Sequence, residues 1–177
     1  LMLGGFFIAQ AMQKVGLDKI LFKLTISKFG TKPKFVLLGI MLVTSVFSMI
    51  MSNTATTAMM IAAIIPFVNT LDKEAPFTKA VLIGIPASAS LGGMGTIIGS
   101  PPNAIAVEAL TNAGIQFSFL DWMILGFPIA ILSVGLFWFL LTSKYVPKVS
   151  VIDLSFLNNL DTEEDDTQLF KVKRRIT

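Results

Sequence analysis

The chain has 177 residues, of which 54% are hydrophobic and only 14% are charged, and its net charge is +3. Soluble globular domains carry about 25% charged residues, so this composition argues against an ordinary soluble domain and indicates a membrane protein, in which about 20 consecutive apolar residues cross the bilayer. The chain has no cysteine and no histidine, which excludes disulfides, histidine- or cysteine-based zinc sites and His-based triads, and we expect no enzyme activity.

The first 34 residues predict two elements. Residues 1–13 are apolar and are expected to be the end of a membrane-spanning helix. Residues 14–34 contain six lysines with leucines and isoleucine at helical spacing among them, which is typical of an amphipathic helix lying in the membrane interface. Because the chain opens in apolar sequence without a basic leader, we expect it to be a piece of a longer protein.

Residues 35–71 contain no charge, and a polar turn, Ser52-Asn53-Thr54, lies near their centre. The stretch is too long for one span and short for two. Basic residues flank it on both sides, and positive charge stays on the cytoplasmic side of a membrane, so both of its ends are expected there. We favour a re-entrant hairpin with the turn near the midplane. Two short full spans joined by a tight external turn would satisfy the same charge pattern.

Residues 76–110 form the next segment, and small or rigid residues interrupt it at Gly92, Gly93, Gly95, Gly99, Pro101 and Pro102. Glycine and proline at this density break a helix, and a broken backbone at membrane depth is tolerated only where protein or a water-filled cavity satisfies its polar groups. The sequence therefore predicts two half-helices around a loop, with the second half starting near Pro102-Asn103.

The remaining segments complete the predicted topology. Residues 111–121 lack Lys and Arg and are expected to be an external loop, 122–143 a full span, and 149–177 a polar cytoplasmic linker. All 14 basic residues then lie on the cytoplasmic side, within 14–34, 72–79 and 144–177. We therefore attribute the positive charge to membrane orientation and expect no nucleic-acid partner.

Two polar clusters are candidate binding sites. Ser48 and Ser52, four residues apart, are predicted on one face of the helix that leads to the turn. With Asn53 and freed backbone carbonyls they offer hard oxygen ligands that suit Na⁺. The same residues would serve equally to cap a helix or join two helices, and that alternative stays open.

The second cluster is the loop Gly92 to Asn103, which precedes a new helix. A helix N-terminus carries positive partial charge and attracts anions. Two discontinuous elements that both end in a helix N-terminus are the expected geometry of a secondary-transporter site. The candidate acid, Glu108, is expected at the external interface. We therefore favour coupling to Na⁺ over coupling to protons.

The motifs Ser52-Asn53-Thr54, Gly92-Gly93-Met94-Gly95-Thr96 and Gly99-Ser100-Pro101-Pro102-Asn103 resemble those of the divalent anion/sodium symporter family, the INDY-type dicarboxylate transporters, over most of residues 1–148. The resemblance implies an all-α, polytopic membrane fold, with this chain as the first of two inverted repeats of an elevator-type homodimer. Residues 35–110 would then move, whereas 1–34 and 111–148 would be scaffold.

The resemblance also implies roles for individual residues. The Na⁺ ligands would be Ser48, Ser52, Asn53 and the backbone around Gly99. The substrate carboxylate would contact Asn53, Thr54, Ser100 and Pro101. No second Ser-Asn-Thr motif occurs, so the C-terminal repeat that completes the site would lie outside this chain. The expected function is Na⁺-coupled symport of succinate- or citrate-like anions. The alternatives are a sulfate transporter or a non-transporting membrane or channel subunit.

Overall fold

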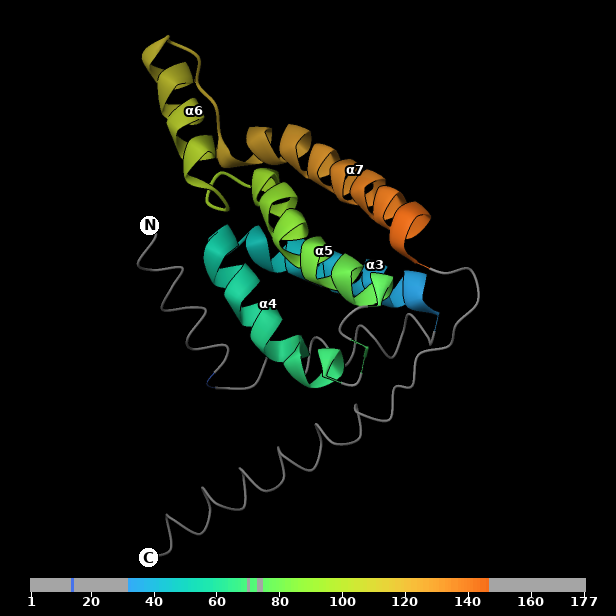
Figure 1. Cartoon of the computed structure of the whole chain (residues 1–177). Helices are drawn as coiled ribbons and strands as arrows, with labels where there is room; N and C mark the ends of the chain where they lie inside the picture. Colours follow the sequence, from blue (N-terminus) through green and yellow to red (C-terminus); the bar gives the residue numbers. More distant parts are fainter. Residues whose placement is uncertain (1–13, 15–31, 70, 73–74, 147–177) are drawn as a thin grey trace, which may run out of the picture.

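The computed structural model describes residues 14, 32–69, 71–72 and 75–146. The predictions for 1–13, for nearly all of the amphipathic helix 14–34 and for the tail 149–177 lie outside these residues. Within them every regular element is helical, which confirms the predicted all-α class (Figure 1). The elements are α3 (Pro33–Ser48), α4 (Asn53–Val68), α5 (Pro76–Gly92), the short 3-10 helix η1 (Gly93–Gly95), α6 (Pro101–Asn112) and α7 (Phe119–Tyr145).

A helical hairpin opens the described part of the chain. Helix α3 begins at Pro33, where the missing N–H of proline costs nothing, and it ends at Ser48. After four intervening residues α4 begins at Asn53. Ser52 is its N-cap in extended conformation, and the Ser52 hydroxyl accepts from the Ala55 amide at 3.3 Å. The prediction that Ser48 and Ser52 share one helix face is therefore wrong, because Ser52 caps α4 instead of extending α3.

Helix α5 holds the two arms of the hairpin. Each arm packs more extensively on α5 than on the other arm. The core between them is fully buried aliphatic and methionine side chains, among them Leu37, Met41, Met60, Ile64 and Ile85. The hairpin and α5 therefore form one packed unit.

The predicted segment 76–110 is broken at the glycines and prolines, as the sequence predicts. Helix α5 ends at Gly92, η1 follows, and α6 begins at Pro101, one residue before the predicted start. Pro101 and Pro102 both fit into the first turn of α6, where the backbone N–H groups lack intrahelical partners.

Helix α7 runs back along α5 (Figure 1) and is fixed near both of its ends. The Trp122 indole donates to the Met94 carbonyl at 3.0 Å, and the Trp138 indole donates to the Lys34 carbonyl at 2.7 Å. The helix begins at Phe119, three residues before the predicted span, because Ser118 and Asp121 form a capping box that satisfies the first amides.

Helix lengths and charge positions fit a membrane protein. Among the described residues two helical stretches, Pro76–Gly95 and Phe119–Tyr145, are long and apolar enough to cross a membrane. The hairpin arms have 16 residues each, about 24 Å at 1.5 Å per residue, which is less than the hydrocarbon thickness of about 30 Å.

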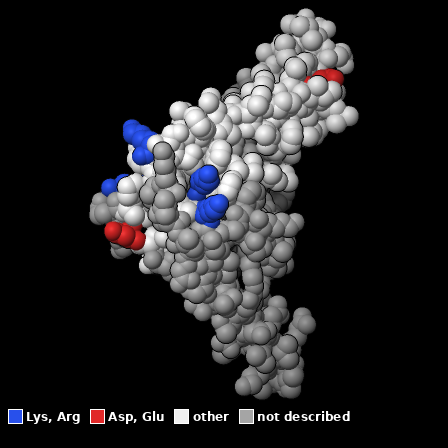
Figure 2. All heavy atoms as spheres, turned by 90° about the vertical axis from the view of Figure 1, so that its right-hand side faces the viewer, with Lys and Arg blue, Asp and Glu red and all other residues white. Residues whose placement is uncertain are grey.

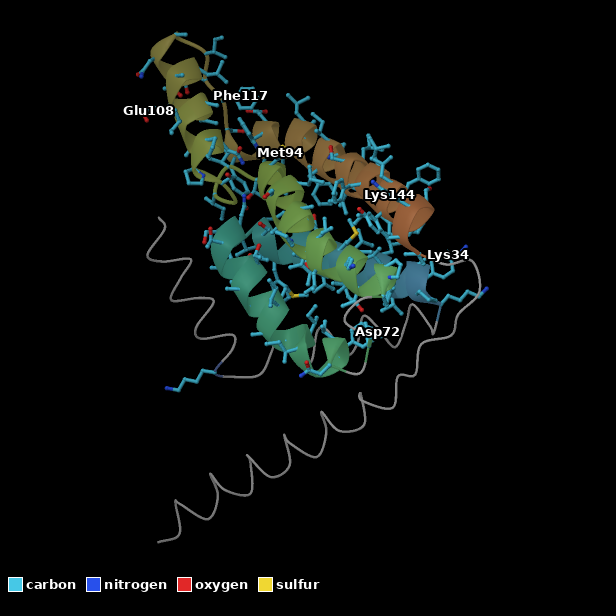
Figure 3. The ribbon with its side chains drawn as sticks, in the orientation of Figure 1. Lys34, Asp72, Met94, Glu108, Phe117 and Lys144 are labelled. Atoms are coloured by element: carbon cyan, nitrogen blue, oxygen red, sulfur yellow. The ribbon has the colours of Figure 1, made fainter. Side chains whose placement is uncertain are left out.

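The four labelled charged side chains lie at two ends of the helical unit. Lys34, Lys144 and Asp72 lie near one end and Glu108 near the other (Figure 3). Figure 2 shows an uncharged surface between the lysines and the acidic group near the top of the view. This separation is what a membrane-embedded middle requires, because charge in the bilayer interior is costly.

The contact of α3 with α5 depends on Gly92. A Cβ there would lie 2.5 Å from the Cα, carbonyl and hydroxyl of Ser45. We expect Gly92→Ala to force the helices apart and to destabilise the full-length protein by about 1–3 kcal/mol, as overpacking does. Thermal unfolding in detergent measures this.

The matched control is Gly135→Ala on α7, where an added Cβ meets nothing within 4 Å and alanine favours the helix. An unchanged melting temperature for Gly92→Ala would contradict the close helix contact.

Candidate functional site

The hairpin tip meets the end of α5 and the loop before α6. Ser48, the last residue of α3, is fully buried, and its hydroxyl donates to the Ala89 carbonyl at 2.6 Å. Asn53, the first residue of α4, reaches the same place from the other side of the turn. The tip is thus joined to α5 by side chains on both of its helices.

The amide group of Asn53 faces three oxygen atoms. They are the Ser48 hydroxyl at 2.7 Å and the carbonyls of Ala89 at 3.1 Å and Gly99 at 3.2 Å. Carbonyls only accept hydrogen bonds, so the amide nitrogen is placed toward them. Three neutral oxygens from α3, α5 and the loop therefore converge on one side-chain group of α4.

Two glycines let the backbones approach this closely. A Cβ at Gly93 would lie 2.2 Å from the Asn53 amide. A Cβ at Gly99 would lie 2.6 Å from the Gly93 carbonyl and 2.8 Å from the Ser48 carbonyl. Any side chain at either position would displace the tip from the loop.

Two further polar side chains organise the loop. The Thr96 hydroxyl donates to the Met49 carbonyl and accepts from the Gly99 amide at 3.1 Å. The Asn103 amide donates to the carbonyls of Gly93 and Thr96, each at 2.8 Å. These contacts satisfy backbone groups that the break in the helix leaves open.

The structure brings together three of the four predicted Na⁺ ligands: Ser48, Asn53 and Gly99. The fourth, Ser52, caps α4, as the alternative for this residue anticipated. Ala89, which supplies a carbonyl to the cluster, was missed, because a backbone acceptor leaves no trace in residue type.

The predicted substrate residues lie at two helix N-termini. Asn53 and the exposed Thr54 begin α4, the half-buried Ser100 is the N-cap of α6, and the exposed Pro101 is its first residue. The Ser100 side chain makes no capping bond to α6. Asn53 contacts Gly99, so the two N-termini approach each other. Their partial positive charge suits an anion.

The chemistry available here is electrostatic. The described residues contain no group of three or more His, Cys, Asp or Glu that would hold a transition metal. The converging atoms are hydroxyl, amide and carbonyl groups, which are hard, uncharged ligands suited to a monovalent cation such as Na⁺. This arrangement fits the binding of a cation and an anion rather than bond-breaking chemistry.

Comparison with known proteins identifies the family. The family profile described as "Citrate transporter" (CitMHS) matches residues 1–174. An uncharacterized transporter of Haemophilus influenzae is 38% identical over 151 residues, which cover 84% of this chain and 32% of that protein. A sodium-dependent dicarboxylate transporter of Staphylococcus saprophyticus is 36% identical over 149 residues, covering 78% and 29%.

An inorganic phosphate transporter of Saccharomyces cerevisiae is 33% identical over 141 residues, which cover 80% of this chain and 15% of that protein. The chain thus spans less than a third of the length of these relatives. The resemblance to sodium-dependent dicarboxylate transporters is confirmed. The chain belongs to the citrate transporter (CitMHS) family of membrane transport proteins and is not an enzyme.

Proposed function

We propose that this chain is the N-terminal part of a Na⁺-coupled symporter of di- or tricarboxylates such as succinate or citrate. The observation that carries the proposal is the convergence of the Ser48 hydroxyl and the Ala89 and Gly99 carbonyls on the Asn53 amide. These oxygens come from two separate discontinuous elements. A cation bound among them, with the Asn53 side-chain oxygen turned toward it in place of the amide nitrogen, would link the hairpin tip to the loop. The name of the dicarboxylate relative, which includes sodium dependence, supports the same coupling ion.

The substrate anion would lie at the N-termini of α4 and α6, near Asn53, Thr54, Ser100 and Pro101. Among the described residues between Lys34 and Lys144, the one basic residue is Lys79, in the first turn of α5, so the anion would depend on helix amides, hydroxyls and bound Na⁺. Affinity would then be low without Na⁺, which is a physical basis for coupling. A C-terminal repeat would complete the site, and we propose that the full protein is a dimer.

The packing bears on which parts would move in an elevator mechanism. The indole of Trp122 and the close contact of Gly126 with the Met94 carbonyl attach α7 to the broken-helix loop. We therefore propose that α7 moves together with the hairpin and the broken helix. This replaces the expectation that residues 111–148 are scaffold, whereas the assignment of 1–34 to the scaffold is kept.

Asn53 is the residue whose loss tests the ion site most directly. In the full-length transporter, Asn53→Ala removes the group on which the three oxygens converge. We expect sodium-driven succinate uptake into proteoliposomes to fall at least about tenfold, the factor that corresponds to 1.4 kcal/mol.

Asn112→Ala is the matched control, because Asn112 is an exposed asparagine at the other end of α6, and it should transport normally. Wild-type uptake by Asn53→Ala at equal protein level would refute the site.

The short hairpin arms and the separated charges support the re-entrant topology. We propose that the lysine-bearing end is cytoplasmic, in keeping with the positive-inside rule. Cysteines at the exposed positions Asn69, directly after α4, and Asn112, the last residue of α6, should then be labelled by an impermeant reagent from opposite sides. Asn112 should react from outside intact cells and Asn69 only after permeabilisation. Reaction of both positions from outside would overturn the hairpin.

A second candidate substrate class is inorganic oxyanions, because one relative is an inorganic phosphate transporter. The two classes differ in length, since a dicarboxylate presents a second charged group beyond the one at the helix N-termini. We expect unlabelled succinate, but not phosphate or sulfate in equal excess, to reduce sodium-driven succinate uptake by the full protein. Competition by phosphate as strong as that by succinate would favour the oxyanion assignment. Sodium-independent, non-saturating flux would instead identify a channel.

A further inference from the structure

Thr96 occupies the junction between hairpin and loop without belonging to the proposed ligand set. Its side chain is buried, at 5% exposure. The hydroxyl uses its single hydrogen on the Met49 carbonyl, and one of its lone pairs accepts the Gly99 amide at 3.1 Å. One atom therefore connects the end of α3 to the loop.

Both partners of this hydroxyl adjoin proposed ligands. Met49 follows Ser48 directly, and Gly99 itself carries one of the carbonyls that face the Asn53 amide. The Gly99 amide lies in the peptide plane that precedes the Gly99 carbonyl, so holding this amide restrains the position of the Cα from which the carbonyl extends. The Thr96 hydroxyl therefore restrains the backbone beside two oxygen donors, the Ser48 hydroxyl and the Gly99 carbonyl, on opposite sides of the junction.

Asn103 restrains Thr96 in turn. It is 7% exposed and uses both amide hydrogens, one on the Gly93 carbonyl and one on the Thr96 carbonyl, each at 2.8 Å. It lies in the first turn of α6, so it ties the far end of the loop to its beginning. The loop is thus closed on itself by one amide and joined to the hairpin by one hydroxyl.

We propose that Thr96, held by Asn103, is a positioning residue that sets the spacing between the hairpin-tip donors and the Gly99 carbonyl, and thereby the affinity for Na⁺. The inference rests on the sodium coupling proposed above. Partners that orient metal ligands typically change affinity by about 10- to 100-fold when removed. A Thr96 that only stabilises the loop would instead lower protein yield or maximal rate and leave the sodium requirement unchanged.

The test measures succinate uptake by the full-length transporter in proteoliposomes as a function of Na⁺ concentration. Thr96→Val, which keeps the shape and removes the hydroxyl, should raise the Na⁺ concentration for half-maximal uptake about 10- to 100-fold. The rate at saturating Na⁺ should change by less than about twofold. Thr96→Ser, which keeps the hydroxyl, should restore the wild-type requirement.

Thr111→Val is the matched control, because the Thr111 hydroxyl is exposed and bonds only within α6. If Thr96→Val does not reach the membrane, Asn103→Ala replaces it and should give the same shift. An unaltered Na⁺ requirement in a folded variant, or a Thr96→Ser variant as impaired as Thr96→Val, would overturn the inference. Wild-type uptake that ignores Na⁺ would instead refute the proposed coupling, and this inference with it.

Discussion

The contact of the Asn53 amide with oxygens from three segments is the interaction on which the rest of the described structure depends. It joins the start of α4 to the end of α3, to α5 and to the loop before α6. Positions 93 and 99 require glycine, because the Asn53 amide and the carbonyls of Gly93 and Ser48 occupy the space that a Cβ would need. The packing of α5 between the hairpin arms brings these groups to one point. A change at any of them therefore alters the relation between the hairpin and the broken helix.

A broken backbone in an apolar setting must satisfy its own polar groups, and the chain does so with few side chains. Two prolines at the start of α6 remove amides that would lack partners. Asn103 donates to the carbonyls of Gly93 and Thr96. The Thr96 hydroxyl donates to the Met49 carbonyl, and the Trp122 indole donates to the Met94 carbonyl. The Ala89 and Gly99 carbonyls face Asn53 instead. The break between α5 and α6 therefore creates a cluster of oxygen donors.

Much of the architecture could be predicted from the sequence, because charge, glycine and proline mark segment ends. The hairpin and the break after Gly92 follow from such marks. Ser48 and Asn53 were candidates because of their polar side chains, whereas the role of Gly99 was implied only by the resemblance to the symporter family. The exact end of α3 could not be predicted, because Ser52 could either belong to the last turn of α3 or cap the start of α4. In the structure it caps α4. The start of α7 was missed because the capping box at Ser118 lies outside the apolar run. Ala89 contributes only a carbonyl, which depends on tertiary placement and not on residue type.

We propose that Na⁺ binds where the Asn53 amide meets the Ser48 hydroxyl and the Gly99 carbonyl. A high-resolution structure of the full-length transporter in saturating Na⁺ tests it most directly. We expect density for an ion among these groups, with the Asn53 side-chain oxygen turned toward it. This density should be lost when Na⁺ is replaced by a large organic cation. An ion bound elsewhere, with the Asn53 amide nitrogen still on both carbonyls, would contradict it.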